Sequence, residues 1–392
     1  MKFIFILFFS FSLIASCSSS PDSADTSTDS LTDITHPTAG NIPSEDEVAD
    51  ILAIGKHQEI EGLSWINEKF IDIEEYASIG KIHGEQEEIF GRIEDAAIDS
   101  RDRVFLLDSG RRVVGVFSAD GEYLATLGGR GQGPGEFENP RSLAIIEDQL
   151  LLVSHSFSIE VFDISSDMKF KKTVQFERPV NSMCVIGDTL FIQSVGFTEE
   201  DEVPAENYRK MIHAYSLPSF DPLFSFGQSY QSRNPMIIGR MSPGSLSCNE
   251  ASSMVVFAFE RMNVIQGYSS KDGSMQWVTR IDDLNTPVIS ETIRDGRPAM
   301  SYGVSESGLM DMLTTPVAIH EELMLLQVLR TSTELAVERE FFTFALNTTN
   351  GMGSYVSDKI PEISAFNKNG YIISRGVAQD LMVSQVYRVN LE

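Results

Sequence analysis

The sequence has few cysteines, few basic residues and only one long hydrophobic run. Three cysteines in 392 residues exclude a disulfide-stapled scaffold and any zinc module built from several cysteines. Lysine and arginine number 30 against 57 aspartates and glutamates, which gives a net charge of −27. So acidic a chain predicts no nucleic-acid-binding surface. Hydrophobic residues still make up 42% of the chain, which is enough to bury a large core.

The single hydrophobic run lies at the N-terminus. It follows Met1-Lys2, extends over residues 3–14 and ends before small residues, which predicts a signal peptide over residues 1–16. Twelve residues rise only about 18 Å as a helix, too short to span a bilayer of about 30 Å. The motif Leu13-Ile14-Ala15-Ser16-Cys17 resembles the bacterial lipobox, which implies lipidation of Cys17. An ordinary secretory signal with a chance cysteine is the alternative.

A polar segment follows the signal. Residues 18–50 contain seven Ser, five Thr, six Asp and two Glu, and neither Lys nor Arg. Such a composition cannot bury enough apolar surface to offset the chain entropy lost on folding. We therefore expect residues 17–58 to comprise the lipidated Cys17 and a disordered acidic tether. The predicted location is extracytoplasmic, on a bacterial membrane, and the outer membrane is the preferred one. The sequence does not decide between its periplasmic face and its outer face.

The rest of the chain contains a repeated unit of four short strands. In its clearest copy the second and third strands are residues 104–108 and 113–117. Asp120-Gly121 then forms a hairpin turn between apolar runs. The second strand of each copy begins at one of six residues: Val104, Leu150, Leu190, Met254, Leu323 and Tyr371. Most spacings are close to the period of about 40–45 residues of a propeller blade. Residues 59–392 are therefore predicted to form an all-β, six-bladed β-propeller of four-stranded antiparallel blades.

The last copy lacks its fourth strand, because the chain ends soon after residue 389. An unassigned strand-like stretch precedes the first copy, at residues 65–79. We predict that this N-terminal stretch completes the last blade and closes the ring, which leaves no open sheet edge.

A family resemblance supports this fold. Residues 94–140 include Val-Phe-Leu-Leu-Asp, Val-Phe-Ser-Ala-Asp-Gly-Glu and a glycine-rich segment that begins at Gly128-Gly129. This stretch resembles NHL-type repeats of the NHL/TolB-like propellers, and most of all the six-bladed β-propeller lipoproteins of Bacteroidota-type bacteria. The resemblance implies the fold and the lipid anchor and assigns no chemistry. The segment Asp108-Ser109-Gly110-Arg111-Arg112 departs from the usual Asp-x-x-Asn-x-Arg, so loop contacts do not transfer from the family.

The four strands of a blade are called A to D in chain order, so the B–C and D–A connections lie on one face of the disc and the A–B and C–D turns on the other. All long insertions replace B–C or D–A connections, whereas every A–B turn is short. We therefore expect the insertions on one face. The insertions are residues 128–140, 198–208, 227–243, 282–315 and 331–339. Binding loops cluster in this way on rigid scaffolds. We expect the longest insertion to form a lid or a small subdomain, with a short helix near residues 305–313.

Arginines gather in or beside these loops. Those predicted to bind a ligand are Arg111, Arg112, Arg141, Arg178, Arg261, Arg330 and Arg375. Arg111, Arg261 and Arg330 occupy the same repeat position. The planar guanidinium suits carboxylate or phosphate, so one interpretation is a cationic mouth for an anionic ligand. In the other, the arginines pair with nearby acids of the chain.

Other chemical motifs favour structural roles. The glycine-rich segment at residues 129–135 leads into a strand rather than a helix, so we predict a blade connector and not a phosphate loop. The six histidines are too dispersed to predict a metal site or a triad. Cys184 and Cys248 are expected as two buried thiols about 8–10 Å apart, beyond the roughly 7 Å limit for a disulfide.

The sequence therefore predicts a monomeric, membrane-anchored binding or scaffold module that acts through its long-loop face. Its partners are the lipid membrane, through acylated Cys17, and an unidentified anionic ligand or partner protein. No cofactor and no catalytic residue is predicted. Two alternatives remain open: a calcium-dependent propeller hydrolase, lactonase or lyase with Ca²⁺ bound by carboxylates on the axis, and a purely structural envelope protein. Fold alone does not decide among them.

Overall fold

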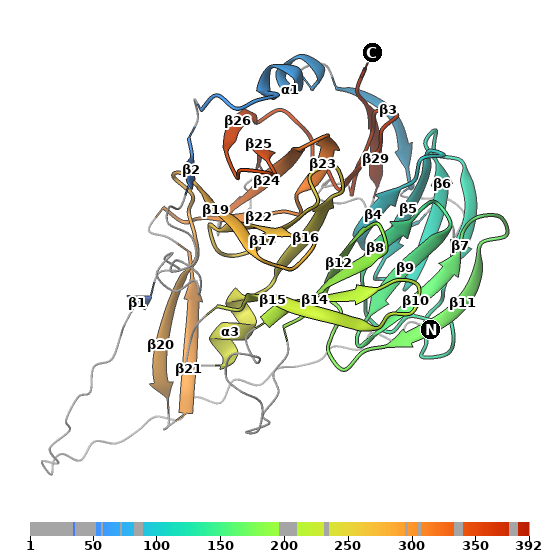
Figure 1. Cartoon of the computed structure of the whole chain (residues 1–392), viewed down its shortest axis with the longest axis horizontal. Coiled ribbons are helices and arrows are strands. Elements are labelled where there is room, and N and C mark those ends of the chain that lie inside the picture. Colours follow the sequence, from blue (N-terminus) through green and yellow to red (C-terminus); the bar gives the residue numbers. More distant parts are fainter. Residues whose placement is uncertain are drawn as a thin grey trace, which may run out of the picture.

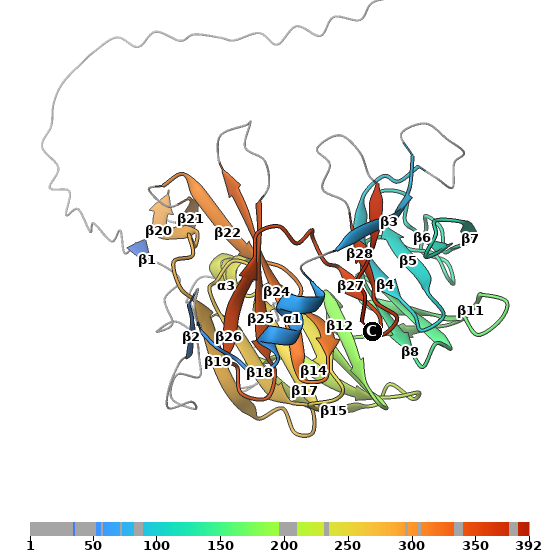
Figure 2. The ribbon, with the colours of Figure 1, turned by 90° about the horizontal axis from the view of Figure 1, so that it is seen from above.

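The structure is a computed structural model. Six sheets, each with an antiparallel four-stranded core, radiate from a common centre (Figure 2), and a seventh, three-stranded sheet includes two strands of the longest insertion. The structure describes residues 34–35, 52–55, 58–70, 73–81, 89–195, 210–230, 235–294, 297–304, 307–332, 340–375 and 383–391. Cys17 and the insertion at residues 198–208 lie outside this part of the chain, as does most of the predicted tether. Within the described part, no helix is long and apolar enough to cross a membrane.

Blades 1 to 3 each have four strands in chain order. Blade 1 consists of β4 (Ile93–Ile98), β5 (Arg103–Asp108), β6 (Val113–Ser118) and β7 (Tyr123–Leu127). Blade 2 consists of β8 (Pro140–Ile146), β9 (Leu150–His155), β10 (Ser158–Asp163) and β11 (Lys169–Gln175). Blade 3 consists of β12 (Ser182–Ile186), β13 (Thr189–Gln193), β14 (Lys210–Ser216) and β15 (Pro222–Gln228).

Blades 4 and 5 each carry an additional strand. Blade 4 consists of β16 (Gly244–Asn249), β17 (Met254–Phe259), β18 (Ile265–Ser269) and β19 (Met275–Ile281), with β2 (Leu52–Ile54) added parallel to β19. Blade 5 consists of β22 (Leu309–Leu313), β24 (Leu323–Ser332), β25 (Glu340–Asn347) and β26 (Gly353–Ser357), and β23 (Val317–His320) also pairs with β24.

Blade 6 joins the two ends of the folded chain. It consists of β27 (Ala365–Phe366), β28 (Tyr371–Ser374), β29 (Ser384–Arg388) and β3 (Glu74–Ile79). The N-terminal β3 pairs antiparallel with β29, with Ala77 opposite Val386. The predicted ring closure and the six predicted second strands are thus confirmed, each within one residue of its expected start.

The blades adhere through alternating side chains, because successive residues of a strand point to opposite faces of its sheet. On β5, Val104 and Leu106 pack in the cluster that includes Ile373 of blade 6, whereas Phe105 and Leu107 pack in the cluster that includes Val153 of blade 2. Both faces of such a strand are buried, which explains its continuous apolar run.

Three sequence-based expectations about local structure are wrong. Residues 63–69 form helix α1 (Leu63–Lys69) rather than a strand, because Ile66 of α1 and Phe70 beyond it bury into the cluster of blades 5 and 6. Leu309–Leu313 is strand β22 and not part of a helix, since it pairs with β24. The folded body begins at β2, inside the predicted tether, because Ile54 is 1% exposed and joins the core of blades 4 and 5.

Two elements mark the long-loop face. The longest insertion contains the hairpin β20 (Val288–Arg294) and β21 (Arg297–Gly303), and β1 (Ile34–Thr35) pairs with β20. Helix α3 (Pro235–Met241) lies in the connection between blades 3 and 4. In Figure 1 the hairpin and α3 lie on the lower side of the disc, and α1 lies on the upper side. The two faces therefore differ in what covers them.

Candidate functional site

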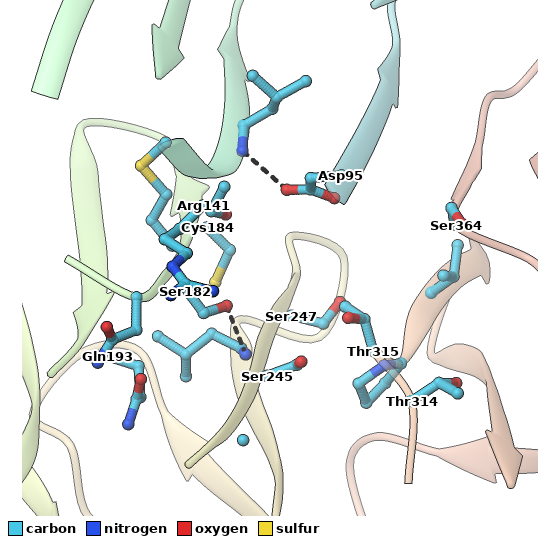
Figure 3. A pocket seen from close by; sticks show the side chains of 18 of the residues that line it. Asp95, Arg141, Ser182, Cys184, Gln193, Ser245, Ser247, Thr314, Thr315 and Ser364 are labelled. Atoms are coloured by element: carbon cyan, nitrogen blue, oxygen red, sulfur yellow. Dashed lines mark hydrogen bonds between the residues drawn. The ribbon is translucent and has the colours of Figure 1, made fainter. Parts of the chain in front are cut away.

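The axis of the propeller contains a cavity of about 870 Å³, here called the axial cavity. Its wall comes from the innermost strands of all six blades, and many of the lining side chains are small. They include Ala97, Ala144, Ser182, Ser245, Ser247, Thr314, Thr315 and Ser364. Figure 3 shows several of them around one space. Small residues near the axis leave this volume open, and ligand pockets typically have about 300–1,000 Å³.

A ring of charges lies where the inner strands begin, toward the long-loop face. Three of the predicted arginines line the axial cavity, and so do three acids: Arg141, Arg261, Arg375, Glu94, Asp95 and Glu260. The predicted anion site is thus a mixed ring with as many carboxyl groups as guanidinium groups. The interpretation in which the arginines pair with nearby acids of the chain agrees with this mixture, although sequence reasoning did not single out Glu94 and Asp95 at the start of the first inner strand.

The arginines of the ring differ in how strongly carboxylates of the chain hold them. Both terminal nitrogens of Arg261 contact Glu260, at 2.6 and 3.1 Å. Arg375 donates to Glu362 Oε1 at 2.6 and 3.1 Å and to the carbonyl of Glu94 at 2.7 Å. Within the described part of the chain, Arg141 has a single, long polar contact, 3.4 Å to Glu94 Oε1, and its side chain is 45% exposed. Arg141 is therefore the ring arginine that is easiest to redirect.

Glu94 itself is shared among several donors. Arg92 Nε lies 3.1 Å from Glu94 Oε2, and Ser109 Oγ lies 3.2 Å from the same oxygen. Because these donors compensate Glu94 without help from Arg141, moving the Arg141 guanidinium toward a ligand leaves no buried carboxylate unpaired.

Asp95 differs electrostatically from its neighbours. Burial raises the pKa of its carboxyl above the usual value, although the N–H groups of Leu143 and Ala96 and the charge of Arg375 act in the opposite direction. The backbone N–H of Leu143 donates to Asp95 Oδ2 at 2.8 Å, and that of Ala96 donates to Oδ1 at 2.9 Å. Asp95 thus links the inner strands of blades 1 and 2 at the cavity wall (Figure 3).

The remaining predicted arginines lie away from the cavity. Arg330 forms a two-pronged pair with Asp311, both at 2.8 Å, and stacks over Phe342 at 4.6 Å. Arg111 donates to the carbonyl of Ile89 at 2.9 Å. Although Arg111, Arg261 and Arg330 share a repeat position, their partners differ, and the structure does not bring them together.

Arg112 and Arg178 also lie outside the axial cavity. Arg112 adopts a left-handed turn conformation with φ of 64°. Arg178 lies near the buried His213, whose pKa is lowered to about 4, first by burial and then by the charges of Arg178 and Lys210. Of the seven predicted arginines, four pair with carboxylates of the described residues: Arg141, Arg261, Arg330 and Arg375.

Gln193 is a further polar residue at the cavity wall that the sequence did not single out. It is 0% exposed, and neither its amide nitrogen nor its amide oxygen has a hydrogen-bond partner among the residues that the structure describes. Gln327 of blade 5 shows the usual arrangement, because Thr343, Pro361 and Ile363 satisfy its amide. An unpaired buried polar group costs about 1–3 kcal/mol, so Gln193 is a locally unfavourable feature of the wall.

The two cysteines of the body correct another prediction. Cys184 and Cys248 form a disulfide with a Cα–Cα distance of 5.6 Å. The inner strands β12 and β16 approach more closely than the period-based radius suggested, and Ser182 Oγ also accepts the N–H of Leu246 at 3.0 Å. Both cysteines line the axial cavity.

The described residues give no support to metal or triad chemistry. No group of three or more His, Cys, Asp or Glu side chains in this part of the chain is arranged to hold a metal ion. His155, Ser158 and Glu160 do cluster, but Ser158 and Glu160 contact the same imidazole nitrogen, Nε2, at 2.7 and 3.1 Å. A catalytic triad needs the nucleophile and the orienting acid on opposite nitrogens of the histidine base, so this cluster is structural.

The same cluster explains the glycine-rich segment. Glu160 accepts the N–H of Gly135 at 3.0 Å and the hydroxyl of Thr173 at 2.7 Å. Glu136 accepts the N–H of Gly133 at 2.9 Å. Carboxylates of the chain thus occupy the places that a phosphate would need, which agrees with the predicted blade connector.

Comparisons with known proteins agree with this architecture. A family model described as "6-bladed beta-propeller" (DUF5128) matches residues 84–209. The chain is similar in structure to a putative exported protein from Bacteroides fragilis, with 10% identity, a TM-score of 0.53, and 87% of this chain and 100% of that chain covered. It is also similar to a member of the DUF4221 family from Bacteroides vulgatus, with 10% identity, a TM-score of 0.52, and 81% and 98% covered. No curated protein matches the sequence. At such identities the likeness concerns the fold.

Proposed function

We propose that this propeller is a lipid-anchored, extracytoplasmic binding module whose ligand enters the axial cavity from the long-loop face. The observation that carries the proposal is Arg141, a half-exposed guanidinium that has one weak partner among the residues the structure describes and lies at the rim of an 870 Å³ cavity. Arginine binds carboxylates and phosphates through parallel hydrogen bonds. The ligand therefore carries an anionic group.

The acids of the ring narrow the ligand further. Glu94, Asp95 and Glu260 line the same cavity, so a ligand with several negative charges meets repulsion. A ligand with one anionic group and neighbouring hydrogen-bond donors fits both halves of the ring. The free carboxylate end of a peptide, whose backbone N–H groups can donate to the acids, has this chemistry.

Three observations support the proposed location. The N-terminal motif ending at Cys17 resembles a lipobox. The Cys184–Cys248 disulfide is typical of oxidising compartments outside the cytoplasm. One of the similar structures is described as a putative exported protein.

Thermal unfolding of the full chain in detergent tests the ligand proposal. Trialanine with a free carboxylate should raise Tm in a saturable way, because a ligand that binds only the folded state stabilises it. Trialanine amide and inorganic phosphate should have a much smaller effect. Arg141→Gln should abolish the shift, whereas Arg101→Gln, an exposed arginine that does not line the cavity, should keep it. Equal shifts with the acid and the amide, or an unaltered shift in Arg141→Gln, contradict the proposal.

Detergent partitioning tests the anchor separately. The wild-type chain expressed in a bacterium should enter the detergent-rich phase of Triton X-114, because several acyl chains bury many methylenes at about 0.8 kcal/mol each. Cys17→Ser should move to the aqueous phase. A Cys184→Ser/Cys248→Ser chain, which keeps Cys17, should still partition into detergent. Recovery of the wild type in the aqueous phase would show that Cys17 is not lipidated.

A further inference from the structure

A second cavity opens on the opposite face of the disc, beneath α1. It has a volume of about 450 Å³ and is here called the α1 cavity. Trp65 of α1, the A–B turns of blades 4, 5 and 6, and Leu391 near the C-terminus form its wall. It shares Ala318 and Phe366 with the axial cavity, so the two cavities lie at the two ends of the same axis. Its chemistry differs from that of the charged ring.

An aromatic platform forms one wall of the α1 cavity. The indole of Trp65 stacks on the imidazole of His320, with ring centroids 4.4 Å apart and an interplanar angle of 18°. Phe70 meets Trp65 edge to face at 6.2 Å and itself contacts Phe366 at 6.0 Å. The packing holds the indole in one orientation, although Trp65 is only partly buried and the His320 side chain is 44% exposed. A fixed, accessible aromatic surface costs little conformational entropy to use in binding.

Free hydrogen-bonding groups surround the platform. Glu250 and Lys368 line the cavity and are exposed, and neither side chain makes a hydrogen bond or ion pair within the described residues. Glu321 is 78% exposed and lies 4.0 Å from His320 Nε2. The amides of Asn249 and Asn367, in contrast, are used to brace neighbouring turns. Hydrogen-bond acceptors and a donor are thus available at the rim of the cavity, whereas the amide groups of Asn249 and Asn367 already have hydrogen-bond partners.

We infer that the α1 cavity binds pyranose rings of a glycan. The axial C–H groups of a pyranose form an apolar face that packs on an aromatic ring, and its hydroxyl groups both donate and accept hydrogen bonds. Trp65 and His320 supply the aromatic surface, and Glu250 and Lys368 supply an acceptor and a donor. The mixed charges of the rim disfavour a ligand with a strong charge of either sign, because a cation meets Lys368 and an anion meets the glutamates.

The chain's tryptophan content makes this inference measurable by fluorescence. It has two tryptophans, and Trp277 is 3% exposed, with its indole N–H donating to the carbonyl of Thr348 at 2.7 Å. A ligand-dependent change in tryptophan emission therefore reports on Trp65. The full chain in detergent is titrated with cellohexaose, maltohexaose and chitohexaose. At least one of the three should change the emission in a saturable way.

Calorimetric titration of variants identifies the residues involved. Trp65→Ala should weaken binding of the active hexasaccharide by about tenfold or more, the equivalent of about 1.4 kcal/mol. Glu250→Ala/Lys368→Ala should also weaken it, with an unchanged Tm because both side chains are exposed and unpaired. Tyr123→Ala, a 43% exposed aromatic on the outer strand of blade 1, should bind as the wild type does.

Several results overturn the inference. The absence of a saturable emission change with all three hexasaccharides does so, as does wild-type affinity in Trp65→Ala. Hexalysine is the comparison for a cationic ligand: saturable binding of hexalysine that is lost in raised salt and in Glu250→Ala identifies a basic peptide site instead. Failure here leaves the axial-cavity proposal untouched, because Arg141 does not line the α1 cavity.

Discussion

Cys184 and Cys248 connect the innermost strands of blades 3 and 4 by a disulfide, at positions separated by 64 residues in the chain. The bond lies in the wall of the axial cavity rather than in a peripheral loop. It therefore fixes the spacing of two blades within the wall of the axial cavity. This relationship leads to the first of four predictions.

Removing the disulfide should destabilise the body without changing its fold. Closing a loop of this length stabilises a protein by about 2–4 kcal/mol, chiefly by restricting the unfolded chain. Cys184→Ser/Cys248→Ser should lower the free energy of unfolding by that amount, as measured by urea titration. The wild type in reductant should approach the stability of the double variant. Identical urea midpoints for oxidised and reduced wild type would show that the two thiols are not bonded in solution.

Deleting the N-terminal strand of blade 6 should abolish cooperative folding. Without β3, strand β29 becomes an unpaired edge, and such edges favour aggregation. A chain that starts at residue 81 should aggregate or lack a cooperative thermal transition in calorimetry. A chain that starts at residue 51 keeps β2, α1 and β3 and should unfold cooperatively near the Tm of the longer protein. A cooperative transition in the shorter chain would show that the ring closes without β3.

Acid should destabilise the protein through His213. This histidine is 6% exposed, its Nδ1 pairs with Ser225 Oγ at 2.7 Å, and its Nε2 has no hydrogen-bond partner in the described part of the chain. Because its folded pKa is lowered to about 4, the unfolded chain binds the proton more tightly. Stability is thus retained above pH 6.5 and lost as the pH falls toward 4. The expected loss between pH 6.5 and 5 is about 2 kcal/mol.

Urea midpoints at the two pH values measure the His213 effect. His213→Gln should show a shallower dependence on pH than the wild type. His320→Gln, which removes a 44% exposed histidine, should follow the wild-type curve. Parallel curves for the wild type and His213→Gln would assign the acid sensitivity to other groups.

Breaking the Arg330–Asp311 pair should be costly at neutral pH. Burial alone raises the pKa of Asp311, but hydrogen bonds from Arg330 and Asn285 bring it below the usual value. A carboxyl with a lowered folded pKa stabilises the protein above its unfolded pKa and loses that contribution as the pH falls through the folded one. Asp311→Asn should lower stability by about 3 kcal/mol at pH 7.

The difference between Asp311→Asn and the wild type should shrink below about pH 4, where the unfolded aspartate protonates. Chemical denaturation at pH 7 and pH 3 measures it. Glu321→Gln, a highly exposed carboxylate in the same blade, should cost little at either pH. A pH-independent difference for Asp311→Asn would mean that the hydrogen bonds, and not the charge, are responsible.

The repeat could be predicted from the sequence because local signals determine the blades. Val104 begins a continuous apolar strand, Asp120-Gly121 forms a tight turn, and a similar strand pattern recurs in six copies. Alternating burial on the two faces of each blade follows directly from this pattern. The N-terminal strand could be predicted because the last copy was visibly one strand short.

The features that escaped prediction depend on distances across the molecule. The Cys184–Cys248 bond depends on how closely two inner strands approach near the axis, which the repeat period does not specify. The partner of Arg330 is Asp311, which lies in an insertion without a repeat signal. Trp65 was expected in a strand-like stretch, and it lies in a helix because tertiary packing of Ile66 prevails over the local pattern.

The pairing of Glu75 with Tyr387 brings together residues from opposite ends of the polypeptide. A chain that is synthesised or exported from its N-terminus presents β3 long before β29 exists. The ring therefore closes only when β29 has been made and pairs with β3. Loss of β29 would leave β3 as an open edge and interrupt the circle, although every other blade would keep its strands.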